Sequence, residues 1–248
     1  MASERVVVVT GGSRGIGAAT AVLAGERGYA VCVNYLENRA AAEGIVESIT
    51  TAGGRGIAVR ADVSSEPDVV RLFETVDREL GRATALVNNA GVSPKGNDGA
   101  RLSTLTSSME VWHKVFEVNF FSIIWLARGL MDELAAAKGA IVNVTSIAGS
   151  RVHPFAGSAY ATSKAALAAL TREMASDFGR LGIRVNAIAP GEIDTAILSP
   201  GTEKIVEQIP MQRLGTTDEV AKIIYVLCTE TSSYVNGAEI HINGGQHV

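Results

Sequence analysis

The chain has 248 residues, of which 47% are hydrophobic, 19% charged and 5% aromatic, and its formal net charge is -4. This composition is typical of an aliphatic globular protein and excludes a chain that is disordered over most of its length. The slight excess of acidic residues and the absence of a basic run disfavour nucleic acid as a partner.

Short apolar runs alternate with longer segments of helical periodicity along the chain. We expect strands at residues 6–9, 29–34, 56–61, 85–88, 140–145, 183–189 and 239–242. We expect helices at residues 15–27, 39–51, 66–80, 109–137, 158–178 and 218–228. Right-handed crossovers place a helix between successive parallel strands, so this alternation predicts an α/β fold with a doubly wound, seven-stranded parallel sheet and helices on both faces. No linker or composition shift divides the chain, and residues 1–248 are expected to form one domain.

The first expected strand is followed by the glycine-rich sequence Thr10-Gly11-Gly12-Ser13-Arg14-Gly15-Ile16-Gly17, which opens into a helix. Glycines allow a tight turn and a close backbone approach, and exposed N–H groups at a helix start attract phosphate. The spacing differs from GxGxxG, and a tight strand-to-helix connection is the alternative interpretation. Because the turn lies after the first strand of a strand-helix-strand unit, we favour phosphate binding by a Rossmann fold.

The second expected strand ends at Asn34-Tyr35 without the acidic residue that holds a ribose 2′-hydroxyl in NAD-binding folds. A 2′-phosphate would suit a guanidinium, and Arg14 could supply it. The sequence therefore favours NADP(H). If Arg14 is only a solvated loop cation, NAD(H) is also possible.

Tyr160 and Lys164 are four residues apart on an expected helix and therefore share one face. A nearby cation lowers the pKa of a phenol, so the pair could exchange protons with a carbonyl oxygen. Ser146 follows the fifth expected strand and offers a hydroxyl to the same oxygen. Asn119 interrupts an apolar helical segment, where a buried amide requires hydrogen-bond partners.

Two long segments without clear strand pattern, residues 92–108 and 191–212, each follow an expected strand. Ligands in open α/β sheets bind beyond the carboxyl ends of the strands. We therefore expect these segments to be the substrate loops.

An ordered series of motifs extends along the chain. It comprises the TGxxxGxG turn at residues 10–17, Asp62-Val63, Asn88-Asn89-Ala90-Gly91, Asn119, Ser146, the YxxxK pair Tyr160 and Lys164, Pro190-Gly191 with Ile193 and Thr195, Tyr234-Val235-Asn236-Gly237, and Gly244-Gly245. With this series the chain resembles the classical short-chain dehydrogenases/reductases along nearly its whole length. One departure is Asn243, which stands where the family usually has an acid.

The resemblance implies a role for each matching residue. Asn119, Ser146, Tyr160 and Lys164 would be the catalytic set, in which Lys164 holds the nicotinamide ribose and lowers the pKa of Tyr160, and Asn119 anchors a water chain. The cofactor-binding residues would be Gly11, Ser13, Arg14, Gly15, Ile16, Gly17, Asn34, Tyr35, Asp62, Val63, Asn89, Ala90, Gly91, Pro190, Gly191, Ile193 and Thr195, together with Tyr160 and Lys164.

The implied function is hydride transfer between NADP(H) and a small-molecule carbonyl or secondary alcohol, with Tyr160 as general acid and base. Within the family the chain resembles 3-oxoacyl-carrier-protein reductases and glucose-type or other sugar and polyol dehydrogenases. Docking of an acidic carrier protein would need basic residues near the site, for which Arg172 and Arg180 are candidates. A catalytically silent dinucleotide-sensing protein is the main alternative. A Rossmann-fold methyltransferase is opposed by Asn34 and Lys164.

The remaining features suggest structural roles and a location. The four histidines lack metal-ligand spacing and are expected to be structural or at the surface, although His153 lies between Ser146 and Tyr160 and could touch substrate. Cys32 and Cys228 show neither metal-ligand nor CxxC spacing, which suits a reducing compartment. Residues 1–5 are too polar for a signal peptide and no apolar run reaches membrane-spanning length, so we expect a cytoplasmic protein. The family resemblance and the apolar segment 120–125 imply a homotetramer.

Overall fold

The computed structural model describes residues 5–97, 99–195 and 203–248. Its strands are β1 (Arg5–Val9), β2 (Tyr29–Tyr35), β3 (Arg55–Arg60), β4 (Ala85–Asn88), β5 (Ala140–Val144), β6 (Arg184–Pro190) and β7 (Glu239–Ile242). Its α-helices are α1 (Gly15–Glu26), α2 (Arg39–Thr51), α3 (Glu66–Leu80), α4 (Met109–Phe116), α5 (Ser122–Gly129), α6 (Met131–Ala137), α7 (Ser158–Gly179), α8 (Glu203–Val206) and α9 (Thr217–Leu227).

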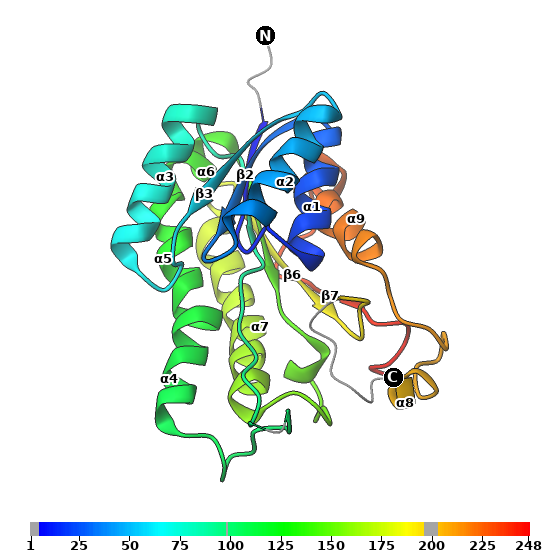
Figure 1. Ribbon diagram of the computed structural model, residues 1–248. Helices are drawn as coiled ribbons and strands as arrows, with labels where there is room; N and C mark the ends of the chain where they lie inside the picture. Colours follow the sequence, from blue (N-terminus) through cyan, green and yellow to red (C-terminus); the bar gives the residue numbers. More distant parts are fainter. Residues whose placement is uncertain (1–4, 98, 196–202) are drawn as a thin grey trace.

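The strands form one seven-stranded sheet in the order β3-β2-β1-β4-β5-β6-β7, and every pair of neighbours is parallel. Helices α1, α2 and α9 cover one face, and α3, α5 and α7 cover the other (Figure 1). The expected doubly wound Rossmann-type sheet is therefore confirmed, with strand ends within one residue of the expected positions.

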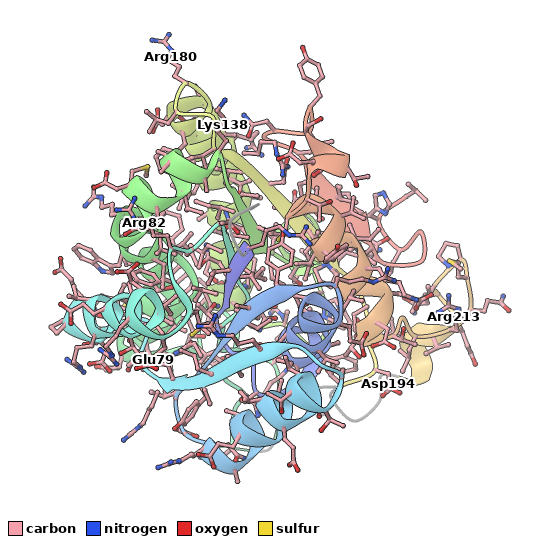
Figure 2. All side chains as sticks on the ribbon, turned by 90° about the horizontal axis from the view of Figure 1, so that it is seen from above. Glu79, Arg82, Lys138, Arg180, Asp194 and Arg213 are labelled. Carbon is pink, nitrogen blue, oxygen red and sulfur yellow. The ribbon has the colours of Figure 1, made fainter. Side chains whose placement is uncertain are left out.

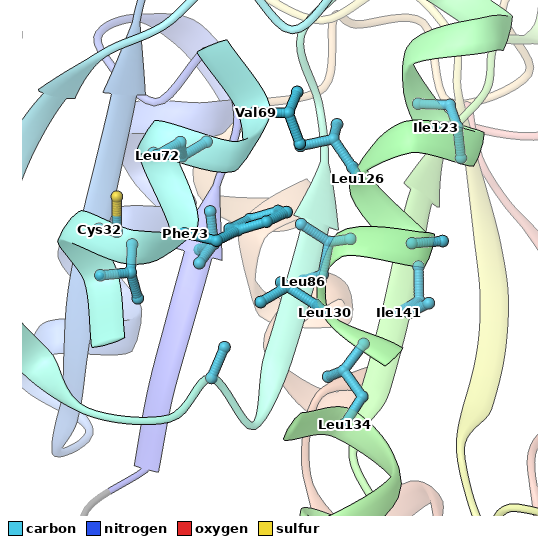
Figure 3. Close-up of a cluster of buried hydrophobic side chains, with 14 of the residues drawn as sticks. Cys32, Val69, Leu72, Phe73, Leu86, Ile123, Leu126, Leu130, Leu134 and Ile141 are labelled. Atoms are coloured by element: carbon cyan, nitrogen blue, oxygen red, sulfur yellow. The ribbon is translucent and has the colours of Figure 1, made fainter. Parts of the chain in front are cut away.

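Both faces of the sheet are buried because helices cover both. Val6 and Val8 of β1 belong to the hydrophobic cluster under α3, α5 and α7, whereas Val7 and Val9 belong to the cluster under α1 and α9. Figure 3 shows the first cluster, in which Leu72 and Phe73 of α3 and Leu126 of α5 lie over Leu86 and Ile141 of the sheet. Each such buried side chain contributes about 1.5–3 kcal/mol, so the valine-rich strands and the apolar helix faces stabilise one another.

The expectation of a single helix at residues 109–137 is wrong. After α4 the backbone forms a π turn, Glu117–Phe121, and α5 then ends at Gly129 before α6 begins at Met131. Asn119 lies in the π turn, where its amide bonds to the backbone of Val92. At Gly129 the helix passes so close to Phe73 that a Cβ would lie 2.7 Å from the ring. Tertiary contacts, which helical periodicity does not reveal, therefore divide this segment.

The sheet places the carboxyl ends of β1, β4, β5 and β6 side by side. The strand order reverses between β1 and β4, because β2 and β3 lie on one side of β1 and β4 to β7 on the other. Crevices at such reversals are the usual ligand sites of open α/β sheets. No helix in the described part of the chain has both the length and the apolar character needed to cross a membrane.

Candidate active site

The turn between β1 and α1 is shaped by its glycines. Gly11 and Gly15 have φ values of 60° and 56°, in the left-handed region that side chains disfavour. A Cβ at Gly17 would overlap the carbonyl of Gly11 and lie 2.5 Å from Nδ2 of Asn89. All three glycines of the motif are therefore required by the local geometry, which leaves the backbone of the turn bare.

Neutral side chains from β1 and β4 fix this turn. The Thr10 hydroxyl accepts the N–H groups of Asn89 and Ala90, both at 3.0 Å. Nδ2 of Asn89 donates to the carbonyl oxygens of Thr10 at 2.9 Å and Gly11 at 3.0 Å. The Asn89 side chain therefore holds the turn.

A phosphate-bearing ligand fits the space beside this turn. Gly15 begins the twelve-residue α1, whose first turn has no acidic side chain. The nearest atom to a Cβ at Gly15 would be the methyl of Thr195, 3.6 Å away on the loop after β6. The start of α1 and Thr195 therefore lie close together, and the exposed N–H groups of a helix start attract phosphate. Ser13 and Ile16 lie half-buried on the same turn.

The loop after β6 forms the other wall. The N–H of Gly191 donates to Ile242 O at 3.0 Å. The N–H of Asp194 donates to Gly215 O and the N–H of Gly215 donates to Glu192 O, both at 2.9 Å, and these two bonds hold Ile193 in a bridge to Gly215. Pro190 ends β6 itself. The sequence-based substrate loop at 191–212 is therefore partly anchored, and residues 196–202 of it lie outside the described residues.

At the end of β2, Asn34 is buried and acts as a connector. Its Oδ1 accepts the N–H of Gly11 at 3.3 Å, and its Nδ2 donates to Ala61 O at 3.1 Å. Tyr35 is also buried. The Asn34 side chain therefore joins the glycine turn to the residue that follows β3. Arg14, by contrast, is exposed at the start of α1 and forms no ion pair with any described residue.

Asp62 and Val63 follow β3 at the next corner of the crevice. Oδ1 of Asp62 accepts the N–H and hydroxyl of Ser64 at 2.9 and 2.6 Å, and Val63 is buried. Gly91, after β4, approaches the centre of the site, because a Cβ there would lie 3.3 Å from Oδ1 of Asn119 and 3.5 Å from Nζ of Lys164.

Tyr160 and Lys164 occupy the first turns of α7, against the end of β5. The Lys164 ammonium is buried, donates to Val144 O at 2.7 Å and lies 5.8 Å from the Tyr160 ring centre. Ser146 follows β5, accepts the N–H of Ala148 at 3.1 Å and lies close enough to Tyr160 to lower the pKa of its phenol. The structure thus brings Ser146, Tyr160 and Lys164 together.

The electrostatics of the pair differ from the sequence-based expectation. Burial raises the pKa of Tyr160, the hydrogen bond from Ser146 opposes this rise, and the negative charge of Glu192 adds to it. Burial also lowers the pKa of Lys164 to about 8. The net pKa shift of Tyr160 is therefore upward, because desolvation of the phenol outweighs the stabilisation of its phenolate.

Asn119 is fully buried, and its side chain is occupied by protein partners. Oδ1 accepts the N–H of Val92 at 2.8 Å, and Nδ2 donates to Val92 O at 3.0 Å and to Ser163 Oγ at 3.1 Å. The amide therefore ties the loop after β4 to α7.

The sequence pattern does not identify Glu192, and it leaves the role of His153 open between a structural position and a substrate contact. The structure pairs them, with Nε2 of His153 2.5 Å from Oε1 of Glu192 and both side chains nearly buried. His153 is therefore neither a surface residue nor an isolated structural one. The available signal was an acid placed between Pro190-Gly191 and Ile193, next to the expected nicotinamide contacts.

The loop at residues 92–108 packs on the segment that precedes α7. The Lys95 ammonium donates to Phe155 O, and Nε of Arg101 donates to Ala156 O at 2.8 Å. The N–H of Ser158 returns a bond to Leu102 O at 2.9 Å. The expected substrate loop therefore does border the Tyr160 side of the crevice; its residue 98 lies outside the described part.

The proposed carrier contacts at Arg172 and Arg180 lie away from the site. Twelve and twenty residues of α7 separate them from Tyr160, which at 1.5 Å per residue is about 18 and 30 Å. Figure 2 shows Arg180 and Lys138 on one side of the molecule and Asp194, on the loop after β6, on the opposite side. Among the described residues, no three His, Cys, Asp or Glu side chains are grouped as metal ligands.

Comparisons with known proteins agree with this arrangement. A family model described as enoyl-(acyl carrier protein) reductase matches residues 11–247. The chain is 53% identical to Protein FixR of Bradyrhizobium diazoefficiens over 98% of this chain and 87% of that protein. It is 32% identical to the 3-oxoacyl-(acyl-carrier-protein) reductase FabG of Staphylococcus epidermidis over 99% of this chain and 100% of that protein. A crystal structure of a 3-oxoacyl-(acyl-carrier protein) reductase with bound NAD from Brucella melitensis superposes with a TM-score of 0.92 at 34% identity, covering 100% of this chain and 92% of that one.

Proposed function

Since the chain belongs to the short-chain dehydrogenase/reductase family, a family of nicotinamide-dependent oxidoreductases, we propose that it transfers a hydride between NADP(H) and a carbonyl or secondary-alcohol substrate. Tyr160 is the general acid in reduction and the general base in oxidation. The observation that carries this proposal is the contact of Tyr160 with Ser146 beside the buried Lys164, at the strand ends that adjoin the glycine turn.

The bound nicotinamide supplies the hydride, and the protein's own residues manage orientation and the proton. Ser146 and Tyr160 direct their hydroxyls toward the oxygen of the substrate, so Tyr160 can protonate it as negative charge develops. The raised pKa of Tyr160 keeps the phenol protonated at neutral pH, which suits an acid in the reductive direction. Lys164 would bind the hydroxyl groups of the nicotinamide ribose. The other proposed cofactor contacts are Gly11, Ser13, Arg14, Gly15, Ile16, Gly17, Asn34, Tyr35, Asp62, Val63, Asn89, Ala90, Gly91, Pro190, Gly191, Ile193 and Thr195.

Preference for NADP(H) is supported by the absence of a carboxylate at the end of β2 and by the exposure of Arg14. The Asn34 amide is already occupied by Gly11 and Ala61, so it neither repels nor replaces a 2′-phosphate. A guanidinium that forms no ion pair with any described residue can form a forked contact with that phosphate.

The test is loss of NADPH absorbance, and separately of NADH absorbance, across acyl thioesters, ketones, diketones, quinones and keto sugars. Tyr160→Phe removes only the acidic hydroxyl and is expected to reduce turnover by about 10²–10⁴-fold while NADPH binding is retained. Tyr234→Phe is the matched control, because Tyr234 is fully exposed. Tight NADPH binding with no turnover of any substrate would instead indicate a dinucleotide-sensing protein.

We also propose that the protein acts as a homotetramer built from one domain per chain. Phe121 is 48% exposed and, with Ile124 and Trp125, lines a hollow on the outer side of α5. An exposed apolar face of this kind is suited to a two-fold contact with a second copy. Light scattering coupled to size exclusion tests the mass, and Phe121→Lys is expected to lower it.

A further inference from the structure

The carboxyl group of Glu192 is nearly buried on the loop after β6, which forms one wall of the crevice. Its side chain is only 8% exposed. The backbone around it is fixed, because Glu192 O accepts the N–H of Gly215 at 2.9 Å and Asp194 N donates to Gly215 O at 2.9 Å. The carboxylate is therefore positioned by an anchored loop, and it points across to the segment that precedes α7.

His153 meets this carboxylate in a defined tautomer. Its Nδ1 accepts the N–H groups of Phe155 and Ala156, each at 3.2 Å, so the lone pair of Nδ1 is occupied. The ring proton therefore lies on Nε2, from which it is donated to Oε1 of Glu192 at 2.5 Å.

The nearby cations donate to backbone oxygens, although the Glu192 carboxylate also acts on the Lys95 ammonium and opposes the lowering of the Lys95 pKa that burial causes. Lys95 donates to Phe155 O, Arg101 to Ala156 O, and Arg151 to Gln246 O. No described residue hydrogen bonds to the second carboxylate oxygen, Oε2 of Glu192, and this oxygen is not sealed from solvent. The charge of Glu192 reaches the phenol of Tyr160, whose pKa it raises. An oxygen that accepts no hydrogen bond from a described residue thus lies between the loop after β6 and the segment that precedes α7, whose first turn carries Tyr160.

We propose that Glu192, oriented by His153, forms an acceptor subsite that binds a hydroxyl group of the substrate close to the carbonyl that Tyr160 protonates. This inference rests on the proposed function and names its substrate class: hydroxylated ketones and the corresponding diols. A hydroxyl that donates to a carboxylate forms a strong, charge-assisted hydrogen bond. A substrate with a methyl group in that place leaves the second carboxylate oxygen, Oε2, without a hydrogen bond, and an anionic substrate is repelled.

The test compares ketones of one shape that differ in the group beside the carbonyl: hydroxyacetone, butanone and pyruvate. A larger pair is hydroxycyclohexanone and methylcyclohexanone. The ratio of kcat/KM for each hydroxy ketone to that of its methyl counterpart is measured with NADPH. We expect the wild type to favour the hydroxy ketones at least about tenfold and to disfavour pyruvate.

Glu192→Gln is the decisive variant. Its amide oxygen can still accept the proton of His153, but its NH₂ group presents a donor where Oε2 presented an acceptor. We expect the hydroxy-to-methyl ratio to fall to within about threefold of unity and pyruvate to be accepted better. Asp194→Asn is the matched control, because Asp194 is an exposed carboxylate two residues away and its removal leaves the ratio unchanged. Circular dichroism and a thermal melt verify that both variants are folded.

The outcomes distinguish failure of the Glu192 subsite from failure of the proposed hydride transfer. Turnover of ketones without discrimination in the wild type, or a wild-type ratio retained in folded Glu192→Gln, overturns the subsite and leaves the proposed function standing. Absence of turnover with every ketone, despite NADPH binding, overturns the proposed function and the subsite together.

Discussion

The two walls of the crevice are built differently. On the cofactor side, the glycine turn is held by Thr10, Asn34 and Asn89, whose side chains are uncharged and bond mainly to backbone groups. On the substrate side, the loops after β4, β5 and β6 are joined by charged or titratable side chains, namely Lys95, Arg101, His153 and Glu192.

The difference between the two walls indicates which property of the protein a substitution on each wall will change. Neutral amides and hydroxyls fix a backbone shape with little dependence on pH or salt, which suits a ligand common to the whole family. Charged groups in a partly dry crevice impose strong preferences on whatever binds beside them. We therefore expect changes on the cofactor side to affect binding of the dinucleotide and stability, and changes on the substrate side to affect selectivity.

Breaking the cofactor side is expected to have the largest effect. In Gly17→Ala the new methyl would overlap Gly11 O and Nδ2 of Asn89, so the turn must shift. We expect an affinity for NADPH reduced by about 100-fold and a free energy of unfolding reduced by about 1–3 kcal/mol. Fluorescence titration and urea unfolding measure the two quantities.

Gly44→Ala is the matched control for this change. Gly44 lies inside α2 with open space around its Cβ position, so alanine there is expected to stabilise the helix by about 0.5–1 kcal/mol without altering NADPH binding. Unchanged NADPH affinity in Gly17→Ala would show that the turn does not form the dinucleotide site.

The buried ammonium of Lys164, at the border between the two walls, is expected to make stability depend on pH. The pKa of Lys164 is about 8 in the folded protein and close to its ordinary value of 10.5 when unfolded. Between these values the unfolded chain binds more protons, so the free energy of unfolding rises with pH in that window. Relative to Lys164→Met, the wild type should gain about 2–3 kcal/mol between pH 8 and 10.5.

Urea unfolding of both proteins at several pH values measures this gain. Other groups that titrate at high pH, including the buried thiol of Cys32 whose pKa is raised by burial, are present in both proteins and cancel in the difference. A difference that stays constant across the window would mean that the ammonium is not desolvated by folding.

The sheet and most helices could be predicted because their signals are local. The valine-rich strands β1 and β2 and the amphipathic α3 carry their periodicity in consecutive residues, and their observed bounds agree closely with the expected ones. The π turn at Asn119 could not be predicted in this way. Its cause is a pair of hydrogen bonds to Val92, which is distant in the sequence.

The site shows the same division. The expected Ser146, Tyr160 and Lys164 meet in the structure, since their positions follow from strand ends and helix spacing. The pairing of His153 with Glu192 joins loops after different strands, and no local pattern specifies it. The direction of the Tyr160 pKa shift was likewise unpredictable, because it depends on how deeply the phenol is buried.

A smaller effect on dinucleotide binding, about tenfold, is expected from Arg14→Ala. This variant distinguishes recognition of the 2′-phosphate from recognition of the pyrophosphate. If the exposed guanidinium binds the 2′-phosphate, its removal should weaken NADPH binding about tenfold and leave NADH binding unchanged. Arg180→Ala serves as the control, since Arg180 is an exposed arginine at the far end of α7. Equal weakening of both dinucleotides would assign Arg14 to the pyrophosphate instead.

The smallest expected effect comes from Arg101→Ala, which loosens the substrate side alone. Arg101 ties the loop at residues 92–108 to Ala156 O, and its guanidinium also reaches Ser158 Oγ at 3.4 Å. Loss of about one net hydrogen bond, about 1 kcal/mol, should raise the KM for the ketone by roughly threefold to fivefold while the Kd for NADPH stays constant. Arg172→Ala, whose guanidinium bonds only within α7, is the control. A parallel rise in the Kd for NADPH would show that the substrate side and the cofactor side of the crevice respond together. The loop after β4 connects them, because it begins at Asn89 and Ala90, which hold the glycine turn.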